Sequence, residues 1–254
     1  MDHIPFETLL RLKRWNTPTI YNGWEAITKA DRTTCFNREP LVDYMPEMGP
    51  MAGFAITVVI QPSEPSHARQ GAEVWAEYRR YVASVPGPKI VVVQDLDKPV
   101  AIGAFWGEVN SSTHWALGCV GTITDGAIRD LDEMRDTGFK ALARGLCVGH
   151  AWSVPVRWNC EVNVFGCSVT PGQLIHADKH GFLAIPQEDE EQLAEAAAFL
   201  DRQECETVIA AAKSTAGMGT DEIMARLDEA GKRYSEAVRA RYAKDGEWRG
   251  KPKG

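Results

Sequence analysis

The chain has 254 residues, of which 44% are hydrophobic and 25% are charged, a composition typical of a globular protein. Its formal net charge of −7 argues against a nucleic acid or an anionic membrane surface as partner. No apolar run reaches the roughly eighteen residues that span a bilayer, and the first residues lack the basic and apolar regions of a signal peptide. We therefore expect a cytoplasmic protein.

The cysteines are scattered along the chain and include no C-x-x-C pair. The six positions are Cys35, Cys119, Cys147, Cys160, Cys167 and Cys205. This spacing argues against a zinc ribbon and against a dithiol redox site. We expect buried free thiols, which behave in a protein core as small hydrophobic groups.

The first forty residues are expected to form a helical entry segment. Apolar residues recur at helical spacing over 5–12, and the segment 17–20, which contains Pro18, is expected to end that helix. A second short helix is predicted over residues 24–29.

From residue 53 to 147 the patterns of strand and helix alternate. In chain order we expect strand 54–60, helix 67–82, strand 89–95, strand 100–106, helix 107–117, strand 119–125, helix 131–137 and strand 141–147. The continuous apolar run in 89–95 indicates a strand buried on both faces. Alternation of this kind is typical of β-α-β units with a mainly parallel sheet, and it predicts the α/β class.

The remaining chain has a different character. Short apolar runs over 162–166, 168–175 and 181–186 are joined by turn sequences, which indicates an antiparallel section that completes a core over residues 41–187. Two long C-terminal helices are predicted over 188–213 and 220–243, a C-terminal segment of 188–243. The tail over residues 244–254 is expected to be disordered.

A first candidate site is the segment 125–130, which follows a predicted buried strand and precedes a helix. Loops after the carboxyl ends of parallel strands line the ligand crevice. Arg129 lies there between Asp125 and Asp130, so it can grip a carboxylate while an aspartate holds a hydrated divalent cation. An arginine and an aspartate after a strand can also form a simple ion pair or a helix cap.

A second candidate site lies at the junction around Gly107. A glycine permits close approach there, and the first N–H groups of the following helix can bind an anion such as the carboxylate of an oxo acid. Glu108 can cap the helix or take part in metal chemistry. Alternatively, the glycine serves only the turn. His114 can lie on the same helix.

The segment 176–181 has two histidines and one aspartate, which can suggest a metal site. Asp178 and Gly181 suit a tight turn between strands, so we interpret His176 and His180 as exposed loop residues instead. No G-x-S-x-G, P-loop or G-x-G-x-x-G motif is present, which leaves hydrolase, nucleotide triphosphatase and dinucleotide functions unsupported.

Together, these pieces resemble a known family. In order, the segments 50–58, 106–108, 118–121, 125–130, 169–172, 178–181 and 185–186 are similar to the family of the regulator of ribonuclease E activity A. That family also includes 4-hydroxy-4-methyl-2-oxoglutarate and 4-carboxy-4-hydroxy-2-oxoadipate aldolases. The resemblance covers about residues 15–210 and implies a swivelling β/β/α domain, in ring-shaped homotrimers or hexamers with active sites between subunits.

The resemblance also implies roles for individual residues. Backbone amides of four consecutive residues would bind the 2-oxo acid: Gly107, Glu108, Val109 and Asn110. Arg129 would bind the substrate, and Asp130 would hold Mg²⁺ or Mn²⁺. A glutamate from the C-terminal helix of a neighbouring subunit would complete the metal site, with Glu204 as our first choice and Glu206 as the second.

These observations predict a divalent-metal-dependent lyase in which Arg129, Asp130 and Glu108 are the catalytic residues. It would release pyruvate from a short 2-oxo acid, by retro-aldol cleavage of a 4-hydroxy-2-oxo acid or by decarboxylation of oxaloacetate. One alternative is a non-catalytic regulator that binds a ribonuclease or another protein. A second alternative is a metal-dependent lyase or dehydratase that acts on a sugar acid.

Overall fold

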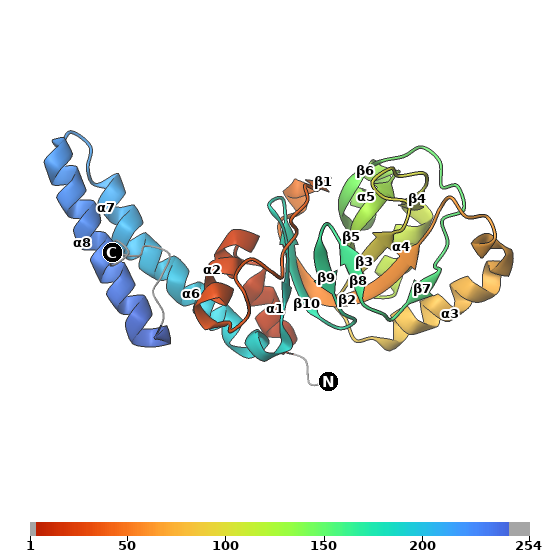
Figure 1. Ribbon diagram of the computed structural model, residues 1–254, viewed down its shortest axis with the longest axis horizontal. Coiled ribbons are helices and arrows are strands. Elements are labelled where there is room, and N and C mark those ends of the chain that lie inside the picture. The colour runs from red at the N-terminus through yellow and green to blue at the C-terminus, as the bar shows by residue number, and fades with distance from the viewer. Residues whose placement is uncertain (1–3, 244–254) are drawn as a thin grey trace. The chain divides into compact units, whose positions relative to one another are not determined.

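The computed structural model describes residues 4–243 (Figure 1). Over these residues the chain divides into two compact units. The first takes in residues up to Thr17 together with Asp31–Glu190, and the second takes in Pro18–Ala30 together with residues from Glu191 onward. The predicted disordered tail, 244–254, lies outside the described residues. Within the described part, no helix is both long and apolar enough to cross a membrane.

The first unit is built on a nine-stranded sheet with the order β1-β6-β5-β3-β2-β10-β11, to which β4 is added beside β5 and β7 beside β2. Its strands are β1 (Val42–Asp43), β2 (Met51–Ile60), β3 (Lys89–Asp95), β4 (Ala104–Trp106), β5 (Cys119–Ile128), β6 (Lys140–Leu146), β7 (Arg157–Trp158), β10 (Leu174–Asp178) and β11 (Gly181–Ile185). A separate two-stranded sheet consists of β8 (Val162–Val164) and β9 (Cys167–Val169).

The centre of the nine-stranded sheet is parallel. β3 pairs in parallel with β2 and β5, and β5 also pairs in parallel with β4 and β6. β10 then joins β2 in the antiparallel sense and forms a hairpin with β11. This topology confirms the predicted α/β class, with a mainly parallel core followed by an antiparallel section.

β3 shows why its apolar run is continuous. Successive side chains of a strand point to opposite faces of the sheet, so Val91 and Val93 enter one hydrophobic cluster while Ile90 and Val92 enter another. All four side chains are fully buried. Burial contributes roughly 1.5–3 kcal/mol for an aliphatic side chain of this size, so β3 is held from both sides.

The helices of the first unit connect these strands. They are α1 (Phe6–Leu12), η1 (Pro46–Met48), η2 (His67–Gln70), α3 (Gly71–Ser84), α4 (Glu108–Ala116), α5 (Leu131–Thr137) and η3 (Gln187–Asp189). The helices expected over 107–117 and 131–137 are confirmed as α4 and α5. The strand expected over 100–106 is shorter than predicted, because only Ala104–Trp106 pairs with β5.

The second unit is helical and consists of α2 (Thr17–Ile27), α6 (Glu190–Glu204), a π-helical turn (Cys205–Ile209), α7 (Ala210–Lys213) and α8 (Thr220–Tyr242), with Thr17 and Glu190 counted in the first unit. The two predicted C-terminal helices are therefore confirmed. The predicted break at 17–20 is wrong, because α2 begins at Thr17. Proline is tolerated in a first helical turn, where its missing N–H needs no partner.

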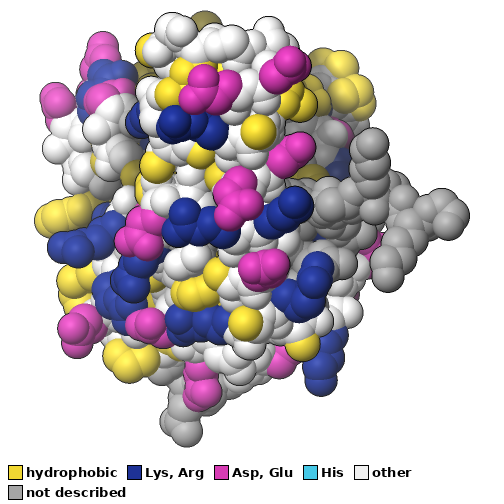
Figure 2. Space-filling view, turned by 90° about the vertical axis from the view of Figure 1, so that its left-hand side faces the viewer, with side chains coloured by type: hydrophobic (Ala, Val, Ile, Leu, Met, Phe, Trp, Pro, Cys, Tyr) yellow, Lys and Arg dark blue, Asp and Glu magenta, His cyan; other side chains and the backbone are white. Residues whose placement is uncertain are grey.

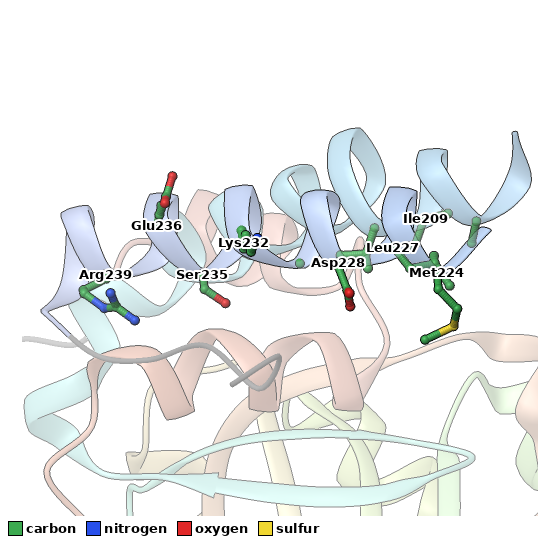
Figure 3. Close-up of a pocket in the computed structure, with 11 residues that line it drawn as sticks. Ile209, Met224, Leu227, Asp228, Lys232, Ser235, Glu236 and Arg239 are labelled. Atoms are coloured by element: carbon green, nitrogen blue, oxygen red, sulfur yellow. The ribbon is translucent and has the colours of Figure 1, made fainter. Parts of the chain in front are cut away.

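The C-terminal hairpin leaves a groove of about 740 Å³ along α8 (Figure 3). Ile209 and Met224, which are 39% and 53% exposed, contribute apolar surface to it. Asp228, Lys232 and Arg239 of α8 add charged groups to its lining (Figure 3). On the face of the molecule seen in Figure 2, basic and acidic side chains are interspersed, with small hydrophobic areas between them.

Candidate active site

The two predicted sites meet at one edge of the sheet. β4 and β5 are parallel neighbours, with Trp106 paired to Ile128 at their carboxyl ends, and the N–H of Arg129 donates to the carbonyl oxygen of Trp106 at 3.0 Å. Gly107 therefore lies beside Arg129 and Asp130, although more than twenty residues separate them in the chain. In parallel sheets this edge is where ligands bind.

Asp130 is held close against Gly107. Its backbone is left-handed, with φ 54° and ψ 51°, a conformation that costs most L residues roughly 1–2 kcal/mol. Its Oδ2 atom accepts a hydrogen bond from the N–H of Glu108 at 3.1 Å and lies 3.5 Å from Nε of Arg129. A Cβ atom on Gly107 would lie only 2.5 Å from this oxygen. Any side chain at this position would therefore displace the carboxylate of Asp130.

Arg129 and the start of α4 supply hydrogen-bond donors. Nη1 of Arg129 donates to the carbonyl oxygen of Val148 at 3.2 Å, and the Arg129 side chain is 38% exposed. Gly107, the N-cap residue of α4, makes no capping hydrogen bond, and the N–H of Glu108 donates to Oδ2 of Asp130. The first N–H groups of a helix have no partner within the helix, so the N–H groups of Val109 and Asn110, which follow Glu108, can bind an anion.

A pocket of about 350 Å³ opens over these groups. Its lining consists of Trp75, Arg79, residues 104–110, Arg129, Asp130, His150 and Ser153. It therefore contains all four residues of the predicted oxo-acid loop and both residues of the arginine–aspartate pair. Four of the lining residues were not predicted from the sequence: Trp75, Arg79, His150 and Ser153. Trp75 and Arg79 lie four residues apart in a predicted helix, so their spacing indicates one shared helix face but not the pocket that this face lines.

Asp125 does not belong to this pocket, and the prediction that it flanks the arginine there is wrong. β5 continues to Ile128, which leaves Asp125 fully buried inside the strand. Its carboxylate accepts hydrogen bonds from the N–H of Asp95 and from Nζ of Lys98, each at 2.7 Å. Burial raises the pKa of Asp125 and raises that of Asp95 to about 6.

The predicted position of His114 on the helix after Gly107 is confirmed, and the residue is fully buried. Nδ1 is 2.7 Å from the carbonyl oxygen of Asn110, and Nε2 is 3.1 Å from the hydroxyl of Tyr78. Burial lowers the pKa of His114 to about 4, so its ring is neutral at neutral pH. These contacts give His114 a structural role beneath the pocket.

The histidines of segment 176–181 do not share one environment. His176 is fully buried in β10, which makes the predicted exposed position wrong. Its Nε2 lies 3.1 Å from the carbonyl oxygen of Leu12, and Nδ1 lies 2.9 Å from the hydroxyl of Thr17. The side chain of His180 is 43% exposed, as expected for a turn. His176 therefore ties β10 to the N-terminal segment.

The cysteines are free, but only two of them fit the expected buried thiols fully. Cys119 and Cys167 are buried, whereas Cys205 is exposed and the other three are intermediate. Burial raises the pKa of both buried thiols to about 12. A protonated thiol is a poor nucleophile, so these two side chains act as core residues.

The pocket offers donors for a hydrated divalent cation. The hydrogen bond and the ion pair of Asp130 both use Oδ2. Neither contact occupies Oδ1, which can therefore bind another ligand. Mg²⁺ commonly binds through one or two carboxylates and keeps several waters, and this donor set fits that mode. Between residues 4 and 243, no group of three His, Cys, Asp or Glu side chains forms a metal cage.

Glu204 and Glu206, the residues expected to complete the metal site from a neighbouring subunit, belong to the second unit. Glu204 is the last residue of α6, and its Oε1 accepts a hydrogen bond from Nδ2 of Asn22 at 3.1 Å. Glu206 lies in the π-helical turn and is exposed. Their proposed role remains a prediction.

Comparison with known proteins gives a family match over most of the first unit. The family model described as "RraA-like: Aldolase/RraA" matches residues 17–184, which include every residue of the pocket. Protein DlpA of Legionella pneumophila is 27% identical over 113 residues, covering 42% of this chain and 18% of that protein. A putative 4-hydroxy-4-methyl-2-oxoglutarate aldolase of Halalkalibacterium halodurans is 28% identical over 140 residues, covering 55% of this chain and 65% of that protein.

Both matches span less than two thirds of the relative's own length. Among solved structures, RraAS2 of Streptomyces coelicolor, described as an unusual member of the RNase ES inhibitor RraA protein family, has a TM-score of 0.63 at 20% identity. That likeness covers 81% of this chain and 96% of the other. At this level of identity the likeness shows the fold alone.

Proposed function

Because the chain belongs to the RraA-like (Aldolase/RraA) family, we propose that it is a divalent-metal-dependent lyase that releases pyruvate from a short 2-oxo acid. The observation that carries this proposal is the meeting of Gly107 with Arg129 and Asp130 at the ends of β4 and β5. A related protein named as a putative 4-hydroxy-4-methyl-2-oxoglutarate aldolase supports it.

Each group has a chemical task in this proposal. The N–H groups at the start of α4 and the guanidinium of Arg129 bind the carboxylate and the 2-oxo oxygen of the substrate. Asp130 holds Mg²⁺ or Mn²⁺, which when bound supplies a Lewis acid that polarises the 2-oxo group. Glu108, at the first turn of α4, accepts a proton from the substrate.

The electron balance is the same for both candidate reactions. In retro-aldol cleavage the C4 hydroxyl loses its proton, the C3–C4 bond breaks, and its electron pair stays on C3 as the enolate of pyruvate. In the decarboxylation of oxaloacetate, loss of carbon dioxide leaves the same enolate. Arg129 stabilises the negative charge that develops on the enolate oxygen, and protonation at C3 gives pyruvate.

We also propose that the protein acts as a homotrimer or hexamer, in which Glu204 of a neighbouring subunit reaches the metal held by Asp130. Glu206 is the second candidate. A single carboxylate is a sparse protein ligand set, and a second carboxylate from another copy would complete it within the usual mode for Mg²⁺.

The first experiment measures pyruvate release from oxaloacetate and from 4-hydroxy-4-methyl-2-oxoglutarate with Mg²⁺ or Mn²⁺. Wild-type protein should show metal-dependent turnover, and Asp130→Ala should lose it by at least about 100-fold, because the metal ligand is gone. Asp136→Ala is the matched control, since Asp136 is exposed on α5 and is not part of the pocket.

Other outcomes would identify the alternatives. No turnover by a folded, oligomeric wild-type protein would contradict the lyase and favour a regulator that binds a ribonuclease, as the described family of RraAS2 suggests for that protein. Metal-dependent consumption of a sugar acid without release of pyruvate would instead support a dehydratase.

A further inference from the structure

Trp75 and Arg79 form a part of the pocket wall that the proposed reaction does not use. They lie one turn apart on α3 and line the same pocket as Arg129 and Asp130. The ring of Trp75 stacks on that of Phe105 in β4, with centroids 5.6 Å apart and planes 11° apart. β4 leads directly into Gly107, so this stack is anchored to the strand that positions the oxo-acid loop.

Arg79 is held above this stack. Its Cζ atom lies 5.2 Å from the centroid of the Trp75 ring, within the range of a favourable cation–π contact. A guanidinium resting on an aromatic face loses less freedom when it binds a ligand, because part of its orientation is already fixed. Its N–H groups remain at the edge of the plane, where they can still donate.

Arg79 differs from other arginines near this edge of the sheet because its charge is not paired with a carboxylate of the described residues. Arg129 pairs with Asp130, Arg135 with Glu47 and Asp132. Throughout residues 4–243, no carboxylate lies within ion-pair distance of Arg79. Ser153, which lines the same pocket, has a buried hydroxyl without a hydrogen-bond partner in this described range. The wall thus presents one cation, Arg79, that can serve a ligand.

We propose that Arg79, positioned by Trp75, binds a second carboxylate at the distal end of the substrate, and so selects dicarboxylic over monocarboxylic 2-oxo acids. This inference rests on the proposed function of the same pocket. A guanidinium can bind a carboxylate through two parallel hydrogen bonds.

A ligand carboxylate would also complement the charge of the wall at Arg79, which lines the pocket. Electrostatic complementarity of this kind favours a ligand with a distal carboxylate over a competitor that lacks one.

The test compares binding of pyruvate and of 2-oxoglutarate by isothermal titration calorimetry, in the presence of Mn²⁺. 2-Oxoglutarate carries the distal carboxylate but lacks the C4 hydroxyl required for retro-aldol cleavage. Arg79→Gln should weaken 2-oxoglutarate at least about tenfold, the effect of losing a charge-assisted hydrogen bond, and should change pyruvate less than about twofold. Arg80→Gln, the adjacent exposed arginine of α3, should change neither.

Trp75→Leu provides a second variant that keeps the charge of Arg79 but removes its support. It should weaken 2-oxoglutarate less than Arg79→Gln does, and it should again spare pyruvate. Wild-type protein that binds both ligands, with Arg79→Gln weakening both equally or neither, would overturn the distal subsite and leave the lyase standing. Wild-type protein that binds neither 2-oxo acid with Mn²⁺ would overturn both proposals.

Discussion

Gly107 lies in close contact with the side chains of Asp130 and Arg129. Its φ is −166°, an extended conformation open to any residue, so backbone freedom does not explain the glycine. A Cβ atom there would lie 2.5 Å from Oδ2 of Asp130 and 3.2 Å from Nε of Arg129. Because both atoms belong to the groups proposed to bind metal and substrate, the smallest added side chain would act on the chemistry directly.

Gly107→Ala should therefore lower kcat/KM for pyruvate release by about 100-fold, as expected when reacting groups move by about 1 Å. The Tm should change little, since the pocket is open and both side chains can shift into it. Gly145→Ala is the matched control, because a Cβ on this β6 glycine would meet nothing within 4 Å. Wild-type turnover in Gly107→Ala would contradict this role of the glycine.

Among the secondary-structure elements, the sequence predicts the bounds best where the residues of the element itself determine its structure. The expected bounds 89–95 and 131–137 match β3 and α5, because an uninterrupted apolar run and the residues that flank a short helix are visible in the sequence. The strand after residue 119 was predicted too short. β5 runs on through Asp125 to Ile128 because Lys98 compensates the buried carboxylate, and that compensation comes from another part of the chain.

The same reason explains which site residues could be predicted. Gly107, Arg129 and Asp130 each follow a strand, and parallel topology brings such positions to one edge. Trp75 and Arg79 reach the pocket only through the packing of α3, with Trp75 stacked on Phe105. Thirty residues separate Trp75 from Phe105 in the sequence. No spacing rule predicts which strand a helix side chain will contact.

Within the second unit, α2 and α6 are closely packed at Gly23. A Cβ atom there would lie 2.6 Å from the backbone nitrogen of Ala197 and 2.7 Å from its Cα. Gly23→Ala should therefore lower the free energy of unfolding by about 1–3 kcal/mol, the usual cost of overpacking. The backbone of α6 has to move, because no flexible side chain can yield.

Gly231→Ala is the opposite control for this prediction. Gly231 lies inside α8, and its Cβ would meet nothing within 4 Å. Alanine there should raise the free energy of unfolding by about 0.5–1 kcal/mol, from helix propensity alone. Urea unfolding followed by circular dichroism measures both variants. Equal effects of the two substitutions would contradict the close packing of α2 on α6.

For the whole molecule, a site shared between subunits predicts complementation. Asp130→Asn and Glu204→Gln should each be inactive alone. When the two variants are mixed after reversible dissociation, about a quarter of the sites should combine an intact Asp130 with an intact Glu204 from another copy, and a corresponding share of activity should return. Glu206→Gln in place of Glu204→Gln tests the second candidate. Mixed oligomers that stay inactive with both partners would exclude a shared carboxylate.

The second unit combines an early and a late segment of the sequence, which are synthesised at different times. α2 lies in residues 18–30 of this unit, yet the helices it packs with come from residues beyond 190. At a synthesis rate of about 5–20 residues per second, α2 would wait roughly ten to forty seconds before α8 is complete. During that interval Ala26 lacks Leu200 and Tyr234, its partners in the hydrophobic cluster of this unit. In a nascent chain, the contacts of Ala26 with this cluster should therefore form only late in translation.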